Sequence, residues 1–258
     1  MNLIQSDEIY YQSISPTLLS RHQLDNYLAH GWFRMKQSIF TTSHLTGIKD
    51  ELDVIKKVWW LRYAVDDIKS HRSHRKILNR AADFSVSIDR FKDEGVEEHQ
   101  LYDLYVKSIH FDGYASLKRF LYGSGTSRRI YQSNIIRIRE KGKLIGAGIF
   151  DCGIEAAASG IHFYDPAYAK YSLGKMMILF TINYMRSCGM KWYYPGYIVA
   201  GSTKMNYKLF LGEDGAYYYD NINNSWLAYN PSIKDEILFS EEQLLDYIDK
   251  ILDFQVDE

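Results

Sequence analysis

Residues 164–208 concentrate the residue types from which a substrate-binding edge is built. Asp165 and Pro166 give a turn signal, Ser172-Leu173-Gly174 opens an apolar segment, and Gly189 marks its end. This spacing predicts a helix start, where backbone amides lack intrahelical partners and carry the positive end of the helix dipole. Because such an end attracts polar and anionic groups, the sequence indicates a ligand site at this turn.

Side chains around the helix start could complete a group-transfer site. Asp165 is able to orient an incoming ammonium group or accept its proton, although an Asp before Pro is also a common turn former. Ser172 could equally be a plain helix cap, and the aromatic residues could be strand packing. The substrate-binding candidates here are Tyr171, Ser172, Leu173, Gly174, Lys175, Tyr194, Gly196, Tyr207 and Lys208, and the catalytic candidates are Asp165, Tyr197 and Lys204.

Residues 69–80, KSHRSHRKILNR, form the densest positive segment of a chain whose formal net charge is −1. That near-neutral balance excludes a generally polybasic protein, so any contact with nucleic acid must be local. Arg72, Arg75 and Lys76 would lie within about one helical turn of each other and present several phosphate donors together, and Arg80 is a further tRNA-binding candidate at the end of the segment. The alternative for an isolated charge run is a solvated helix face.

The elements expected to position these residues belong to an α+β protein. Apolar spacing and capping residues predict helices over residues 16–30, 96–110, 114–122, 173–188 and 240–254. β-branched and aromatic runs predict strands over residues 32–42, 54–65, 84–91, 132–139, 144–150, 154–164, 192–194, 216–219 and 226–229. The linker-like run at 123–127 divides the chain into an N-terminal α/β subdomain, 1–122, and a second subdomain, 128–258.

The order of elements after residue 128 is similar to the core of GNAT-type acyltransferases. It runs through a hairpin, a third strand, a helix and a further strand. In enzymes of that fold that use coenzyme A, small residues at the helix start let the amides approach a pyrophosphate. Gly174 suits that role, but Tyr171 replaces a basic or amide residue and Met176 stands where the smallest residue is expected. The sequence therefore argues against coenzyme A as the acyl donor.

A second resemblance is more specific. YDPAYAKYSLG, KWYYPGY and KMNYK are similar to the C-terminal region of the arginyl-tRNA-protein and bacterial leucyl-tRNA-protein transferases. Upstream, AHGWFRMKQSIFTT and the basic segment with its flanks resemble further parts of that family, so about two thirds of the chain is covered. The resemblance implies transfer of arginine or leucine from aminoacyl-tRNA to a protein's N-terminal amine in the N-degron pathway. It also implies tRNA binding by the basic segment, and recognition of an acidic acceptor residue by Arg34 and Lys36.

One departure from that family concerns metal binding. Where the family carries a cysteine group, this chain has Thr41-Thr42-Ser43-His44, and its two cysteines, Cys152 and Cys188, lie far along the sequence. We therefore expect neither a metal nor another cofactor. Either packing replaces the metal, or the acceptor pocket has changed.

Three functions remain open at this point. The leading hypothesis is an aminoacyltransferase that acts on aminoacyl-tRNA and a protein or peptide N-terminus; the alternatives are a coenzyme A-dependent N-acyltransferase and a non-catalytic tRNA-binding protein. The sequence shows no signal segment and no apolar run of membrane-spanning length, so we expect a cytoplasmic protein. It does not identify the amino acid that is carried.

Overall fold

The computed structural model describes residues 10–45, 56–109, 114–123, 128–203 and 205–235. Its strands are β1 (Tyr11–Ile14), β2 (Phe33–Met35), β3 (Ser38–Thr42), β4 (His44–Leu45), β5 (Lys56–Ala64), β6 (Ser85–Arg90), β7 (Ser133–Glu140), β8 (Lys143–Cys152), β9 (Ala156–Tyr164), β10 (Trp192–Val199), β11 (Ala216–Asp220) and β12 (Ser225–Ala228). Its α-helices are α1 (Arg21–Ala29), α2 (Arg72–Asn79), α3 (Val96–Ser108), α4 (Leu117–Tyr122) and α5 (Leu173–Ser187). Two short 3-10 helices border the site described below, η2 (Pro166–Tyr171) and η3 (Asn206–Leu209).

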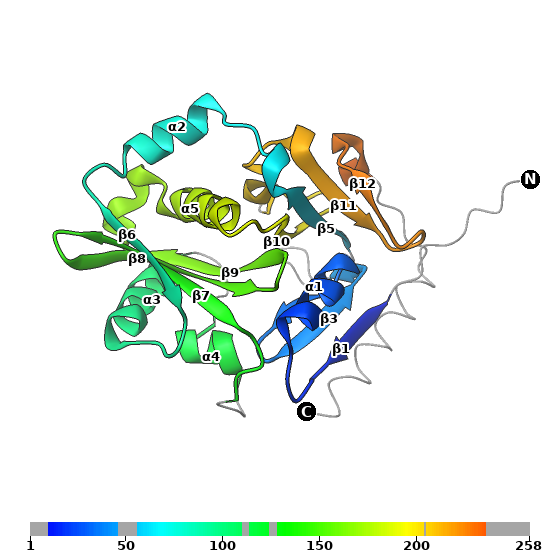
Figure 1. Cartoon of the computed structure of the whole chain (residues 1–258), viewed down its shortest axis with the longest axis horizontal. Coiled ribbons are helices and arrows are strands. Elements are labelled where there is room, and N and C mark those ends of the chain that lie inside the picture. The colour runs from blue at the N-terminus through cyan, green and yellow to red at the C-terminus, as the bar shows by residue number, and fades with distance from the viewer. Residues whose placement is uncertain (1–9, 46–55, 110–113, 124–127, 204, 236–258) are drawn as a thin grey trace, which may run out of the picture.

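A nine-stranded mixed sheet organises the molecule (Figure 1). Its strand order is β12-β11-β5-β10-β9-β8-β7-β6, and β4 pairs with β5 off that path. A separate three-stranded sheet has the order β1-β3-β2. Helices cover both faces of the large sheet: α5 and α2 pack on one face, and α3 with α4 packs on the other. The α+β fold class predicted from the sequence is confirmed, and residues 133–199 contain the predicted GNAT-like order of hairpin, strand, helix and strand.

The alternation of β7 shows why both faces are covered. Ile136 and Ile138 pack in the cluster that contains α5, whereas Ile135 packs with α3 and α4. Successive strand residues point to opposite faces, and both faces here carry apolar side chains that must leave water. Helix α5 is itself apolar around most of its circumference, with Met176, Met177 and Ile182 nearly inaccessible to solvent. The helix therefore lies between the sheet and the elements outside it.

Strands β9 and β10 pair only over part of their length. They are parallel neighbours from Trp192↔Ala156 to Tyr194↔Ala158. Beyond that point β9 continues along β8, while β10 continues along β5 with a register irregularity between Tyr193 and Gly196. The two strands consequently separate after their first three residue pairs, and the sheet opens at its centre.

Several predicted boundaries change in the structure. The first helix begins at Arg21 and not at Pro16, because Ser20 and Gln23 form a capping box that fixes its start. The predicted strand at 192–194 extends to Val199. The predicted helix over 240–254 lies outside the described residues.

The proposed boundary at residues 123–127 does not separate two sheets. Strand β5, from the N-terminal side, lies between β10 and β11, and β6 pairs with β7. The division into 1–122 and 128–258 stays a prediction. Within the described ranges, no helix combines the length and apolarity needed to cross a bilayer.

Candidate active site

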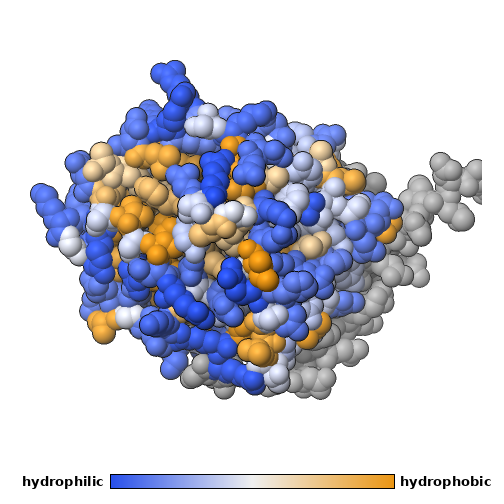
Figure 2. All heavy atoms as spheres, viewed as in Figure 1, coloured by the Kyte–Doolittle hydropathy of each residue, from blue (hydrophilic) through white to orange (hydrophobic). Residues whose placement is uncertain are grey.

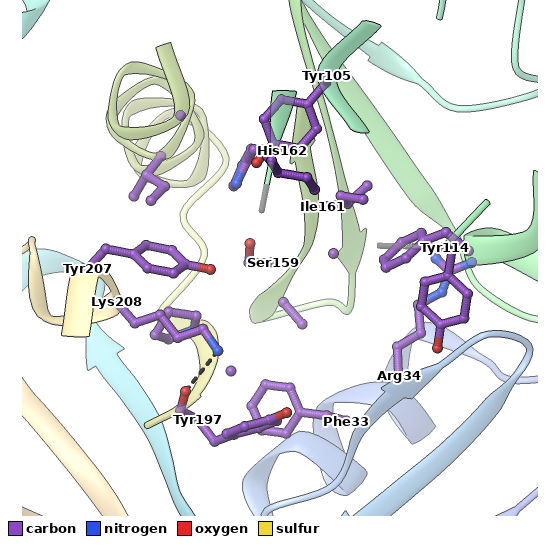
Figure 3. Close-up of a pocket in the computed structure, with 18 of the residues that line it drawn as sticks. Phe33, Arg34, Tyr105, Tyr114, Ser159, Ile161, His162, Tyr197, Tyr207 and Lys208 are labelled. Atoms are coloured by element: carbon purple, nitrogen blue, oxygen red, sulfur yellow. Dashed lines mark hydrogen bonds between the residues drawn. The ribbon is translucent and has the colours of Figure 1, made fainter. Parts of the chain in front are cut away.

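A cavity of about 780 Å³ lies where β9 and β10 separate (Figure 3). Its walls come from residues 159–162 of β9, residues 195–197 of β10, the start of α5, one side of α3, and the β2–β3 hairpin. Most of the lining is aromatic or aliphatic, including Phe33, Trp60 and Tyr105. Apolar walls with a few polar groups are typical of a site that binds an organic substrate and excludes water around it.

The cavity brings together residues that are far apart in sequence and that the sequence singled out separately. Figure 3 shows Tyr207 and Lys208 at one end of the cavity and Arg34 at the other, with Tyr197 and Phe33 along the wall between them. The sequence-predicted residues that line it are Arg34, Lys36, Ser172, Gly174, Lys175, Gly196, Tyr197, Tyr207 and Lys208.

Three predicted substrate-binding side chains do not line this cavity. Tyr171 packs against Phe84, with ring centroids 5.1 Å apart. Leu173 is fully buried in the core under α5, so only its backbone is available at the helix start. Tyr194 is 1% exposed and packs edge-on against Phe33 and Trp226, on the far side of β10. These side chains contribute packing, and their predicted contact with substrate is not supported by their position.

The Asp165 side chain makes hydrogen bonds within the turn before α5. Its Oδ2 accepts a hydrogen bond from Lys143 Nζ at 2.7 Å, and its Oδ1 accepts one from the amide of Ala167 at 3.0 Å. Burial alone would raise the pKa of this carboxyl, but the two hydrogen bonds outweigh it and the pKa is lowered. Its predicted catalytic role is therefore replaced by a turn-forming role. The third predicted catalytic residue, Lys204, lies outside the described residues.

The start of α5 leaves backbone donors at the cavity. Ser172 adopts a left-handed conformation (φ 57°, ψ 46°), and its side chain makes no capping hydrogen bond to the helix. The first amides of an α-helix have no intrahelical partner, so those at the start of α5 remain available to a ligand. Ser172 stands at the N-cap position without the side-chain hydrogen bond of an ordinary cap, and Gly174 and Lys175 line the cavity beside it.

Met176 does not obstruct this helix start. Its side chain is fully buried in the core between α5 and the sheet. The sequence-based argument against coenzyme A relied on Met176 and Tyr171, and both side chains point away from the cavity. That argument is therefore not supported by the structure.

The Arg34 side chain is fixed by contacts within the protein. Its Nη1 donates to Asp151 Oδ1 at 2.9 Å, its Nε donates to the carbonyl of Lys36 at 2.9 Å, and its guanidinium lies 4.6 Å from the Tyr131 ring centroid. Asp151 is 1% exposed and lies near the end of β8, so the buried ion pair ties the β2–β3 hairpin to that end of the strand. Arg34 consequently positions the hairpin, with little donor capacity left for an acceptor side chain.

Two basic side chains in the cavity have lowered pKa values. Burial lowers the pKa of Lys208 to about 7 and that of His162 to about 4, because a charged form there would lose its hydration. His162 lies against Gly148, where a Cβ would come within 2.4 Å of its Cδ2. The imidazole is therefore neutral near pH 7, and Lys208 is divided between its charged and neutral forms.

Sequence reasoning missed the wall formed by α3, α4 and β9. Tyr102, Tyr105, Phe120 and His162 line the cavity from these elements. A signal was present in Ala156-Ala157-Ala158-Ser159-Gly160, because a run of small residues within a strand marks a place where another group approaches closely. That run forms β9 at the point where it leaves β10.

The segment that replaces the family's cysteines is buried and hydrogen-bonded. Thr42 Oγ1 donates to the carbonyl of His44 at 2.6 Å, and Ser43 Oγ lies 2.7 Å from His44 Nδ1. Trp60 Nε1 donates to the carbonyl of Thr42 at 2.9 Å. No group of three or more His, Cys, Asp or Glu residues suited to a metal occurs in the described part of the chain. The hydrogen bonds of Thr42, Ser43 and Trp60 hold this segment in place.

The basic segment forms α2 and its surroundings. His74 and Ile77 anchor the helix, with His74 Nε2 3.0 Å from the carbonyl of Phe210, while Arg72, Arg75 and Lys76 are exposed. These three residues and Arg80 line a shallow hollow, and Figure 2 shows hydrophilic side chains over this edge of the molecule. Arg80 Nη1 donates to the carbonyl of Lys170 at 2.8 Å. Because η2 leads directly into α5, this contact links the α2 patch (Arg72, Arg75, Lys76 and Arg80) to the helix start at the cavity.

Comparison with known proteins identifies related chains. Residues 97–213 match the family described as "Arginine-tRNA-protein transferase, C terminus". The protein from Nitrobacter hamburgensis named "Aspartate/glutamate leucyltransferase" is 29% identical over 196 residues, which cover 72% of this chain and 73% of that protein. A protein of the same name from Afipia carboxidovorans is 28% identical over 194 residues, covering 72% and 74% of the two chains.

Among solved structures, that of L-PGS from Bacillus licheniformis is similar at a TM-score of 0.45 and 12% identity, covering 76% of this chain. This chain spans about half the length of that protein, 53%. The matched region contains most of α3, all of α4 and α5, and β7 to β10, which form much of the cavity wall, whereas the β2–β3 hairpin lies outside it. Over these regions the chain is similar to the aminoacyl-tRNA-protein transferases.

Proposed function

We propose that this enzyme transfers leucine from leucyl-tRNA to the N-terminal α-amine of proteins or peptides that begin with Asp or Glu. The observation that carries the choice of leucine is the lining of the cavity, which includes no Asp or Glu among the described residues. An arginyl side chain would lose its hydration there without gaining a carboxylate partner, whereas a leucyl side chain would gain apolar contacts. The names of the curated relatives support the same amino acid and acceptors.

The cavity can promote aminoacyl transfer by holding the aminoacyl ester and the acceptor amine next to each other. An aminoacyl ester is converted to an amide, so the reaction is downhill and needs no nucleotide hydrolysis. In the proposed arrangement the α5 amides and Lys175 receive the tRNA end, and the ester carbonyl lies in the opening between β9 and β10. The acceptor amine, with a pKa of about 8 when free, then reaches the carbonyl from the hairpin side. Holding both groups in a dry cavity supplies most of the acceleration.

We assign recognition of an acidic acceptor residue to the basic side chains at the end of the cavity that the β2–β3 hairpin forms. Lys36 and Arg34 both line that end of the cavity. Since Arg34 is paired with Asp151, Lys36 is the residue that we propose contacts the acceptor's carboxylate, and Arg34 fixes the backbone from which Lys36 projects. The positive field favours Asp or Glu over Lys or Arg at the acceptor's first position.

The test of this function is a competition among donors and acceptors. The full chain is incubated with a pool of radiolabelled aminoacyl-tRNAs and with matched peptides that begin with Asp, Glu, Arg or Lys. We expect leucine to reach the Asp and Glu peptides at least about 100-fold faster than arginine does, because a buried unpaired guanidinium is strongly disfavoured. Preferential transfer of arginine would overturn the donor assignment. Transfer only from acetyl-CoA, with stabilisation by acetyl-CoA and none by tRNA, would favour a coenzyme A-dependent acyltransferase.

Removing the positive charges of α2 tests its proposed contacts with tRNA phosphates. Changing Arg72, Arg75 and Lys76 together to Gln should weaken tRNA binding and reduce the slope of log K against log salt by about two to three, since each phosphate contact contributes roughly 0.7 to 0.9. The measurement is a tRNA-binding titration at several salt concentrations. Lys107, Lys118 and Arg119, exposed on α3 and α4 across the sheet, give a matched triple-Gln control. Equal effects of both triples would mean that α2 is a solvated surface.

A further inference from the structure

Lys208 is fixed at the opening between β9 and β10. Its Nζ donates to the carbonyl of Tyr197 at 2.7 Å, lies 3.7 Å from Met205 Sδ, and sits 4.5 Å from the Tyr197 ring centroid. Its own backbone carbonyl accepts a hydrogen bond from Tyr63 Oη at 3.1 Å. A Cβ at Gly196 would come within 3.2 Å of Nζ, so the glycine gives the amine its place beside β10. The amine therefore points into the cavity from a defined position, as Figure 3 shows.

The surroundings of Lys208 disfavour its charged form. Among the described residues, no carboxylate forms an ion pair with it, and none lines the cavity. The titratable and charged groups around it are Tyr197 on β10, Tyr207 on η3, Lys175 on α5, His162 on β9, Tyr105 on α3, and Arg34 with Lys36 on the hairpin. All are neutral or cationic near pH 7, because Tyr197, Tyr207 and Tyr105 have raised pKa values in consequence of burial and that of His162 is lowered. Burial removes the hydration of the Lys208 ammonium, and no carboxylate in the cavity lining compensates for that loss, so the pKa of Lys208 is lowered.

We propose that Lys208, in its neutral form, accepts the proton from the acceptor's α-amine during transfer and then donates it to the departing ribose oxygen of the tRNA. This proposal rests on the aminoacyl transfer proposed above and deepens it by naming a catalytic residue. It requires only the donor and acceptor of that reaction, with no further co-reactant.

The proton and bond changes balance. The neutral α-amine attacks the ester carbonyl carbon, and a C–N bond forms as the carbonyl oxygen becomes negative. Lys208 Nζ takes one proton from the attacking nitrogen. The tetrahedral centre then collapses, the C–O bond to the ribose breaks, and the lysine ammonium returns that proton to the ribose oxygen. The products are the amide and the free tRNA hydroxyl, and Lys208 is neutral again.

No other described group in the cavity suits this role as well. His162 is a weak base there, since its pKa is about 4. Asp165 is paired with Lys143 outside the cavity lining, and Arg34 is paired with Asp151. A base whose pKa lies near the working pH is the most effective general catalyst. Lys208 combines that property with a place beside the site of attack.

Substituting Lys208 with Arg and with Met shows whether Lys208 acts as a proton acceptor or only as a fixed positive charge. Arg keeps the charge and cannot release a proton near neutral pH. If Lys208 is the general base, both variants should therefore lose about 100-fold or more in kcat. If Lys208 instead contacts a phosphate or the oxyanion through its charge, K208R should retain most of the activity. Lys118, exposed on α4 and outside the cavity lining, gives the matched control pair, K118R and K118M, with expected rates near that of the wild type.

The pH profile supplies the second readout. Neutral Lys208 is the active form, so the ratio of wild-type to K208R rates should rise with pH through about 7 and then level off, while the acceptor amine's own titration cancels in the ratio. Activity of K208R within about threefold of the wild type, or a flat ratio, would overturn the proposal. Each variant's melting temperature and its affinity for uncharged tRNA confirm that it is folded. The assay uses whichever amino acid the wild type transfers, so failure of the leucine assignment remains distinguishable from failure of Lys208 as the base.

Discussion

Replacing Gly174 with valine should lower kcat/KM for aminoacyl transfer by at least about 100-fold, with a change in the free energy of unfolding of no more than about 1 kcal/mol. A Cβ at this position has only Tyr164 Cε1 within 4 Å, at 3.9 Å, so the first carbon fits without displacement. The two methyl groups of valine extend farther, beside free amides at the start of α5 and within the cavity lining. They would stand where we place the tRNA end.

Gly174→Ala is the matched control for this substitution. It adds the same Cβ with no branch, and Ala favours a helix over Gly by up to about 1 kcal/mol, so the alanine variant should be as stable as the wild type or more so. Steady-state transfer kinetics and chemical denaturation of both variants provide the comparison. If the valine variant remains fully active, the helix start is not part of the site. If it is inactive and unfolded, the alanine variant's kinetics still report whether the added Cβ affects binding of the aminoacyl-tRNA.

The elements of the fold could be predicted largely from local patterns, whereas their arrangement could not. Residues 133–140 and 143–152 alternate around a Lys-Gly turn and form the predicted hairpin, and α5 follows its apolar pattern from Leu173. Strand β5 was also predicted, but its place between β10 and β11 was not. Pairing between residues that are more than a hundred positions apart depends on which apolar surfaces remain uncovered after local elements form, and this information is not local.

The candidate site shows the same limit at the level of single residues. Ser172 and Gly174 could be identified because they mark the start of a helix, and Lys208 because it belongs to the KMNYK motif. Tyr171 and Tyr194 were assigned to the same edge, yet they point away from it. Neighbouring positions on a strand or helix face different directions, and the register irregularity between Tyr193 and Gly196 changes which side of β10 each residue faces. The orientation of a residue near a motif therefore required the structure.

Replacing Arg34 with methionine should destabilise the protein by roughly 3 to 5 kcal/mol and should also abolish transfer. The substitution removes the partner of Asp151, a carboxylate that is 1% exposed and that would keep only Ser133 Oγ as a hydrogen-bond donor among the contacts described. A buried charge without its partner is much less stable than a paired one, and methionine supplies no compensating hydrogen bond. The β2–β3 hairpin, whose Phe33 and Lys36 line the cavity, would lose its ion pair with β8.

A double-substitution cycle distinguishes this explanation from simple loss of packing. Asp151→Asn removes the charge with little change of shape, so combining it with Arg34→Met should recover much of the lost stability and give a favourable coupling energy of about 1 to 3 kcal/mol. Urea denaturation of the wild type, both single variants and the double variant provides the four free energies of unfolding. Additive losses would mean that Arg34 acts through its packing against Tyr131 and its contacts with backbone carbonyls. If the double variant is stable but transfers no amino acid, the positive charge itself is required at the acceptor end of the cavity. If it is stable and active, the role of Arg34 is to hold the hairpin, which leaves Lys36 as the residue that contacts the acceptor's acidic side chain.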